Sequence, residues 1–209
     1  MAMNNRLLAL FTGLALTLST SIASAILITV DPDDFADGTD ISNAFSGITL
    51  SAIDGGNNVL LTSSVFSQAS SLASTGTQVF GHDGIFTQTW ANGLVGDLRI
   101  DFLQVTDFVS IDIIANNGFD PGFLEAYDSS GTLLDSFVTQ GDLGSGTSET
   151  ASISSASANI AYVIASGLSG NDVGLDNLTY NSATVPEPTV LALLSFGLLG
   201  IGIAKRKKV

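Results

Sequence analysis

The sequence contains no cysteine and a single histidine, His82, among its 209 residues. The lack of cysteine excludes disulfide bonds, zinc sites built from thiolates, and cysteine nucleophiles. One histidine cannot form the H-E-x-x-H motif of metal hydrolases, which needs two. The G-x-S-x-G motif of serine hydrolases is also absent, since Gly167-Leu168-Ser169-Gly170 falls short of it. We therefore predict that the chain is not an enzyme.

Basic residues are scarce as well. The net charge of the chain is -14, and residues 26–183 hold nineteen acidic residues against one base, Arg99, so that this part carries 1 − 19 = −18. Such a surface repels phosphate backbones, which excludes nucleic acid as a partner. It is compatible with cation binding or simply with solubility.

The N-terminal 25 residues have the three-part layout of a secretory signal peptide. A positively charged start with Arg6 precedes an apolar stretch from Leu7 to Leu18, and Ala23-Ser24-Ala25 follows. The last three residues fit an A-x-A cleavage site, and the apolar stretch is short for a membrane span. We predict a signal peptide over residues 1–25 and a mature, exported chain that begins near Ile26.

The C-terminal end carries one further apolar run, from Thr189 to Ala204, interrupted only by Ser195 and small residues. About 16 residues give roughly 24 Å of helix, a little less than the roughly 30 Å of a bilayer core. A basic tail follows directly, made of Lys205, Arg206, Lys207 and Lys208. Basic residues beyond a span stay in the cytoplasm, so we predict a transmembrane helix over 189–204 with the acidic domain outside the membrane.

Four residues precede this run: Val185, Pro186, Glu187 and Pro188. Each proline fixes its own φ and favours extended geometry in the residue before it, so the segment is a stiff polyproline-type strand. It is well presented to a processing enzyme, although a helix stop and spacer is an equally good explanation from physics alone.

The order of these three parts at the C-terminus resembles the PEP-CTERM sorting signal of exported bacterial proteins. The resemblance implies recognition of the Pro-Glu-Pro motif by a membrane enzyme, exosortase, often in organisms that make exopolysaccharide. It further implies anchoring in the inner membrane before processing, and then a place at the cell surface or in the extracellular matrix of a biofilm. The resemblance covers residues 185–209 and says nothing about the function of the exported domain.

The exported domain, residues 26–184, shows short period-2 patterns and no long helical one. Polar residues and glycine mark turns between the apolar segments, for example Asp128-Ser129-Ser130-Gly131. This pattern predicts an all-β, antiparallel β-sandwich of jelly-roll type. The segments expected to contain strands are 41–52, 58–61, 98–102, 109–113, 123–138, 161–165 and 174–180, whereas 67–74 is expected to be a loop or a short helix.

The order of these segments resembles galactose-binding-like jelly rolls, the fold of many carbohydrate-binding modules. The residues that carry the resemblance are Phe35-Ala36-Asp37-Gly38-Thr39, Ala126-Tyr127-Asp128 and Gly174-Leu175-Asp176-Asn177-Leu178. The resemblance implies a structural calcium ion between the first strand region and the last, with Asp37, Thr39 and Asp176 as its ligands. Five aspartates between Asp31 and Asp40 would suit such an ion, and a solvated acidic loop is the alternative.

Aromatic residues are the main sequence test for sugar binding. The strand patterns bury Trp90, Tyr127, Tyr162 and Tyr180 at least partly, and His82 between glycines is expected in an exposed turn. The leading hypothesis is therefore an exported, exosortase-sorted protein with a non-catalytic structural or adhesive domain. A carbohydrate-binding module with structural calcium would instead require an exposed aromatic, and a hydrolase would require facing carboxylates or His82 near a serine and an aspartate.

Overall fold

The computed structural model describes residues 26–53, 62–84, 87–118, 120–140 and 144–182. The predicted signal peptide, transmembrane helix and basic tail lie outside these ranges, as do Val185, Pro186, Glu187, Pro188 and the strand expected at 58–61. Within the described ranges, the structure has no helix that is long and apolar enough to cross a membrane.

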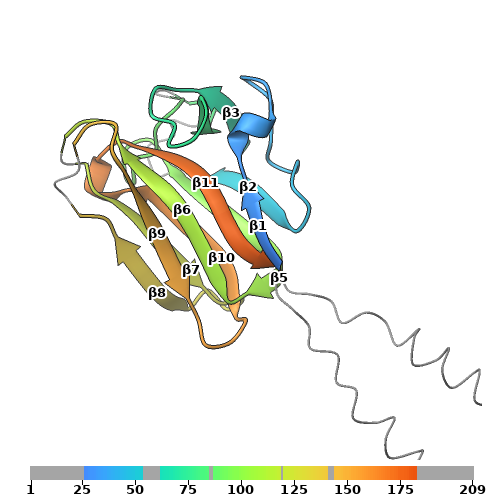
Figure 1. Ribbon diagram of the computed structural model, residues 1–209. Helices are drawn as coiled ribbons and strands as arrows, with labels where there is room; N and C mark the ends of the chain where they lie inside the picture. Colours follow the sequence, from blue (N-terminus) through green and yellow to red (C-terminus); the bar gives the residue numbers. More distant parts are fainter. Residues whose placement is uncertain (1–25, 54–61, 85–86, 119, 141–143, 183–209) are drawn as a thin grey trace, which may run out of the picture. The chain divides into compact units, whose positions relative to one another are not determined.

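The described residues form two antiparallel sheets that face each other (Figure 1). The four-stranded sheet has the order β1 (Ile26–Val30), β11 (Val173–Ser182), β6 (Phe108–Ala115) and β9 (Ser148–Ser154). The five-stranded sheet has the order β2 (Ile48–Ile53), β5 (Asp97–Thr106), β10 (Ile160–Gly167), β7 (Gly122–Tyr127) and β8 (Leu133–Val138). A separate hairpin pairs β3 (Phe66–Ala69) with β4 (Gln78–Gly81). The predicted all-β antiparallel sandwich is confirmed.

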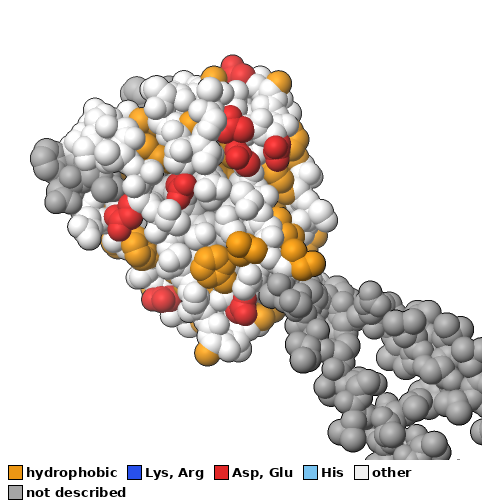
Figure 2. Space-filling view, viewed as in Figure 1, with side chains coloured by type: hydrophobic (Ala, Val, Ile, Leu, Met, Phe, Trp, Pro, Cys, Tyr) orange, Lys and Arg blue, Asp and Glu red, His pale blue; other side chains and the backbone are white. Residues whose placement is uncertain are grey.

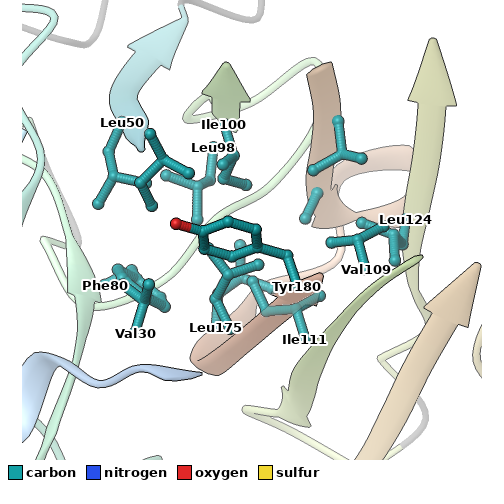
Figure 3. Close-up of a cluster of buried hydrophobic side chains, with 14 of the residues drawn as sticks. Val30, Leu50, Phe80, Leu98, Ile100, Val109, Ile111, Leu124, Leu175 and Tyr180 are labelled. Carbon is teal, nitrogen blue, oxygen red and sulfur yellow. The ribbon is translucent and has the colours of Figure 1, made fainter. Parts of the chain in front are cut away.

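The core lies between the two sheets and follows the period-2 patterns of the sequence. In β5, Leu98 and Ile100 point inward and are completely buried, while Arg99 between them is only partly buried. Figure 3 shows Tyr180 of β11 among apolar side chains from both sheets, including Leu50 and Ile111. Burial of the Tyr180 ring leaves no polar group unpaired, because its hydroxyl donates a hydrogen bond to the carbonyl oxygen of Ser46 at 3.0 Å.

Two strand predictions need correction near the N-terminal half. The early strand expected at 41–52 is confined to β2, because the residues before Gly47 form turns. The segment expected as a loop or short helix begins with strand β3, which pairs with β4 and continues as a loop from Ser70. Ser67 ties this hairpin to the segment after β1: its backbone exchanges hydrogen bonds with Gly38 and Thr39, and its hydroxyl donates to the carbonyl oxygen of Pro32.

The loop between β3 and β4 covers part of the outer face of the four-stranded sheet. Gly174 of β11 allows the close approach of Leu72 from this loop, since a Cβ at Gly174 would lie 3.0 Å from the Cβ of Leu72. Residues of β6 that point away from the core are buried for the same reason, and β6 is buried over nearly its whole length. The same loop also contacts two acidic residues of this sheet, Asp112 and Asp176, through Ser74.

The first and last described residues lie side by side. Strand β1 runs antiparallel to β11, with Ile26 opposite Ser182 and Val30 opposite Leu178. Residues Ile26–Ala183 form one compact unit, and every residue of the hydrophobic core belongs to it. This unit therefore has what it needs to fold without the two ends of the chain.

Candidate functional site

The outer face of the five-stranded sheet carries a row of charged and aromatic side chains. Register brings them together from three neighbouring strands, because Tyr162 of β10 lies opposite Asp101 of β5 on one side and Tyr127 of β7 on the other. Their neighbours along these strands, such as Ile100, Val163 and Ala126, point into the core. We call Arg99, Asp101, Tyr162, Tyr127 and Glu125 the tyrosine strip.

The side chains of the tyrosine strip form a stack that crosses the three strands. The rings of Tyr127 and Tyr162 are nearly parallel, with centroids 4.8 Å apart and an interplanar angle of 7°. The guanidinium carbon of Arg99 lies 3.8 Å from the centroid of the Tyr162 ring. Because β10 lies between β5 and β7, Arg99 and Tyr127 approach the Tyr162 ring from opposite sides. Both faces of the Tyr162 ring are thus covered by these two neighbours.

Hydrogen bonds hold both ends of this stack. Arg99 donates to both carboxylate oxygens of Asp101, from Nε at 2.8 Å and from Nη2 at 2.6 Å. The hydroxyl of Tyr127 donates to Oε2 of Glu125. Paired donors and acceptors of this kind fix the side chains before any ligand arrives, which lowers the entropy cost of binding.

The surroundings of the strip raise the pKa of two of its groups, Tyr127 and Arg99. Burial and the neighbouring carboxylate of Glu125 raise the pKa of Tyr127 to about 12, so its hydroxyl stays a hydrogen-bond donor at neutral pH. The hydrogen bonds to Asp101 raise the pKa of Arg99 above its ordinary value. Arg99 is the only lysine or arginine of residues 26–183, and the strip is where its charge is neutralised.

A second polar cluster lies under the β3–β4 loop. Asp112 of β6 and Asp176 of β11 are both buried, and the hydroxyl of Ser74 lies 2.8 Å from Asp112 Oδ2 and 3.0 Å from Asp176 Oδ2. Thr150 and Asn177 donate further hydrogen bonds to Asp112, and the backbone N–H groups of Ser74 and Thr75 donate to Asp176. These donors stabilise two buried carboxylates and tie the loop to the sheet.

The residues expected to bind calcium have separate partners. Asp37 accepts a hydrogen bond from the backbone N–H of Ala69 at 2.8 Å, and Thr39 bonds through its backbone to Ser67. Asp176 instead accepts from Ser74 and Thr75. Among the residues that the structure describes, no three acidic or histidine side chains are placed to share one metal ion.

Asp31 lies near two other carboxylates, those of Asp33 and Asp176. Burial, with the nearby carboxylates of Asp176 and Asp33, raises the pKa of Asp31. Asp33 uses Oδ1 to accept from the N–H groups of Thr77 and Gln78, whereas its Oδ2 is buried and has no hydrogen-bond partner. Negative charge is thus concentrated just after the end of β1 and beside the first half of β11.

His82 lies in the interior, and the expectation of an exposed turn was wrong. Its Nδ1 accepts a hydrogen bond from the backbone N–H of Gly84 at 3.0 Å, and its Nε2 lies 2.9 Å from the carbonyl oxygen of Thr89. The ring packs edge-on against Trp90, with centroids 4.8 Å apart. Both nitrogens have partners, so the ring is buried without cost in lost hydrogen bonds, and burial lowers its pKa. A histidine held in this way is not available as a catalytic base.

A polar depression opens at the end of the sandwich where β6 ends and β11 begins. It has a volume of about 380 Å³ and is lined by Ser71, Leu72, Thr87, Gln88, Thr89 and Asn116. These side chains are uncharged and none is aromatic. The depression lacks the fixed charges and rings that the tyrosine strip offers.

Sequence reasoning found part of the tyrosine strip and missed its assembly. The alternation of Arg99 and Asp101 with buried residues places both on one face, and the partial burial expected for Tyr127 and Tyr162 is confirmed. The at least partial burial expected for Trp90 and Tyr180 is confirmed as well, since Trp90 is completely buried and Tyr180 nearly so. Which strands lie next to one another was not contained in these patterns, so the stack could not be predicted.

Residues 184–207 match the family model described as the PEP-CTERM protein-sorting motif. The chain carries a PEP-CTERM sorting motif at its C-terminus. The resemblance stated above for Val185, Pro186, Glu187, Pro188 and the segments that follow is thereby confirmed. The motif implies export and processing by an exosortase, and it begins two residues after the end of β11.

Several solved β-sandwich domains have a similar course of the chain at low sequence identity. The K2 cleaved adhesin domain of Lys-gingipain is 12% identical, with 75% of this chain and 100% of that chain covered and a TM-score of 0.41. The K3 cleaved adhesin domain of Lys-gingipain from Porphyromonas gingivalis is 13% identical over 74% of this chain and 99% of that chain, with a TM-score of 0.38. A family 29 carbohydrate binding module from Piromyces equi is 9% identical over 78% of this chain and 95% of that chain, with a TM-score of 0.41. Comparison with curated proteins gives no significant sequence match.

Proposed function

We propose that the protein is a non-catalytic, adhesive component of the bacterial surface or exopolysaccharide matrix, and that its jelly-roll domain binds polysaccharide through the tyrosine strip. The sorting motif anchors the chain in the inner membrane through the predicted helix 189–204 until exosortase processes it. The single observation that carries the adhesive role is the stack of Arg99, Tyr162 and Tyr127 on the outer face of the five-stranded sheet.

The chemistry of the strip suits a chain of neutral sugars. Its phenol and carboxylate groups donate and accept hydrogen bonds, as sugar hydroxyls require, and the ring edges supply apolar contact. Because both faces of the Tyr162 ring are covered, binding would depend on the ring edges and the hydroxyl groups more than on stacking of a sugar on that ring. The surrounding negative charge disfavours anionic polysaccharides.

A binding test of residues 26–183 checks this proposal. Affinity electrophoresis in gels that contain neutral or acidic polysaccharides should retard the wild-type domain with a neutral one. Tyr127→Phe removes the hydroxyl that bonds to Glu125 but keeps the ring. Tyr162→Phe removes the hydroxyl of the neighbouring ring and likewise keeps that ring. We expect each to weaken retardation about tenfold, the effect of one or two lost hydrogen bonds.

Tyr180→Phe is the matched control, since it makes the same chemical change at a buried ring whose hydroxyl bonds to Ser46. It should leave retardation unchanged. Equal losses in all three variants, or no retardation of the wild type by any neutral polysaccharide, would overturn the adhesive role.

The absence of catalysis is part of the proposal and has its own support. His82 is enclosed, and the carboxylates of Asp112 and Asp176 are buried and satisfied by hydroxyl and N–H donors. A hydrolase needs such groups at an open cleft. Incubation of the domain with each polysaccharide that it retards should release no reducing ends.

Calcium binding by Asp37, Thr39 and Asp176 remains a second proposal. It is supported by charge: Asp176 and Asp33 each repel Asp31, and the buried Oδ2 of Asp33 has no hydrogen-bond partner. A divalent ion near these groups would relieve that repulsion, although Asp37 would have to exchange its contact with Ala69 for the ion.

Thermal unfolding of residues 26–183 with and without millimolar calcium tests the site. We expect calcium to raise the melting temperature of the wild type and of Asp34→Asn, an exposed neighbour, but not that of Asp37→Asn. A wild-type domain whose melting temperature and titration heat do not respond to calcium would rule the site out.

A further inference from the structure

The sandwich carries a set of exposed apolar side chains at the end where β1 begins and β11 ends. They are Ile26, Leu27, Leu103 and Val105, with exposed fractions of 63%, 59%, 68% and 39%. We call them the end patch. In Figure 2, hydrophobic side chains are visible on this end of the domain, close to the start of β1.

Pairing and hydrogen bonds bring these residues to the same end. Leu27 lies opposite Asn181, next to the last residue of β11. The carbonyl oxygen of Asn181 accepts a hydrogen bond from the hydroxyl of Thr106 at 2.7 Å, and its side-chain amide donates to Asp107. The end of β5, which holds Leu103 and Val105, is therefore fixed beside the end of β11.

The end patch adjoins the part of the chain that leads to the membrane. Only six residues, 183–188, separate Ser182 from Thr189, where the apolar run begins. Fully extended, the seven steps from Ser182 to Thr189 span no more than about 23–25 Å. The headgroup layer that they must also cross is roughly 5–7 Å thick. The end of the sandwich is consequently confined to a thin zone above the bilayer.

We infer that the end patch of Ile26, Leu27, Leu103 and Val105 rests in the headgroup region of a neutral lipid surface while the protein is anchored. Exposed aliphatic side chains gain from burial at this depth, and the tether supplies a high local concentration of lipid. The acidic character of the domain sets the lipid class, because one base against nineteen acids is repelled by anionic headgroups. The inference rests on the anchoring part of the proposed function and is independent of sugar binding.

The contact would also orient the domain. The depression lined by Leu72, Thr87 and Asn116 lies at the opposite end of the sandwich and would face away from the lipid. The tyrosine strip lies on the outer face of the five-stranded sheet, so it would be on the side of the domain rather than on the end that contacts the lipid.

Fluorescence quenching of the mature chain, residues 26–209, in phosphatidylcholine nanodiscs tests the contact. The chain has no cysteine, so Leu27→Cys and Leu103→Cys provide single sites for an environment-sensitive dye. Val138→Cys is the matched control, because Val138 is an exposed apolar strand residue at the opposite end, paired with Phe123. With a quencher carried on the lipid headgroup, we expect at least threefold stronger quenching at positions 27 and 103 than at 138. Replacing a third of the lipid by phosphatidylglycerol should reduce this difference.

Three results would overturn the inference. Equal quenching at all three positions would show that the domain has no fixed orientation. If the dye at position 27 changed its quenching only in discs that hold two chains, the end patch would contact a second copy of the protein instead of lipid. A chain that stays in solution would overturn the membrane anchor together with the inference, whereas an inserted chain without quenching would overturn the inference alone.

Discussion

Hydrogen-bond partners decide where single side chains lie in this protein. His82 sits between glycines in the sequence, yet its ring is enclosed because Gly84 and Thr89 satisfy both of its nitrogens. Tyr180 is buried in the same way through Ser46, whereas Tyr127 keeps its hydroxyl at the surface with Glu125. A residue type therefore sets what partners are needed, and the fold decides whether they are supplied inside or outside.

His82 should make the stability of the domain depend on pH. Burial lowers the pKa of His82 below its ordinary value of 6.5, so the unfolded chain binds a proton at a higher pH than the folded one. The free energy of unfolding should fall as the pH drops below about 6.5, by up to about 1.4 kcal/mol per pH unit. Urea unfolding of residues 26–183 between pH 7.5 and 5.5 measures this slope.

His82→Asn is the comparison for that measurement, since it keeps an acceptor near Gly84 and removes the group that titrates. Its absolute stability should be lower and its slope smaller than that of the wild type, and the difference between the two slopes belongs to His82. Identical slopes for the wild type and His82→Asn would mean that His82 binds its proton equally well in the folded and the unfolded chain.

At the scale of elements, strand alternation predicts which way a residue points but not what covers it. Asp112 alternates with buried isoleucines and points away from the core, as its sequence pattern indicates. It is nevertheless buried, because the loop after β3 lies over β6 and places Ser74 against it. On the outer face of the five-stranded sheet, by contrast, Arg99, Tyr162 and Tyr127 remain partly exposed and form the tyrosine strip.

The end of β10 should tolerate no side chain at Gly167. A Cβ at this position would lie 1.7 Å from the carbonyl oxygen of Asn171 and 2.9 Å from that of Trp90, and both contacts are with backbone. The backbone N–H of Gly167 also donates to Trp90. We expect Gly167→Ala to destabilise the domain by at least about 2 kcal/mol, measured as a shift of the urea midpoint.

Gly118→Ala provides the control for Gly167, since a Cβ at Gly118 would meet nothing within 4 Å. Its effect should stay within about 0.5 kcal/mol. A similar, small effect of both substitutions would show that the turn after β10 relaxes easily.

For the whole molecule, the dominant feature is uncompensated negative charge. Figure 2 shows acidic side chains spread over one face of the domain, and the only base of residues 26–183, Arg99, is paired with Asp101. Like charges repel more strongly in the compact state than in the unfolded chain, so the domain carries an electrostatic cost that dissolved ions reduce.

Salt should therefore stabilise the domain. An increase of sodium chloride from about 10 mM to about 150 mM shortens the screening length from roughly 30 Å to roughly 8 Å. We expect the melting temperature of residues 26–183 to rise by roughly 2–4 °C, the shift that about 1 kcal/mol gives in a domain of this size. Choline chloride, with a chelator present, should act equally, whereas an effect of sodium alone would point to specific ion binding.

The sequence by itself determined the sorting motif, the all-β class and the acidic character of the domain. These features are local or compositional: Pro186-Glu187-Pro188 with its following segments lies in one stretch, and alternation of period 2 needs only neighbouring residues. Only the tertiary structure decided the burial of His82, the loop over Asp112 and Asp176, the tyrosine strip and the end patch. Each of these joins residues far apart in the chain, such as Arg99 with Tyr162 or Leu27 with Leu103, and their meeting depends on strand order and register.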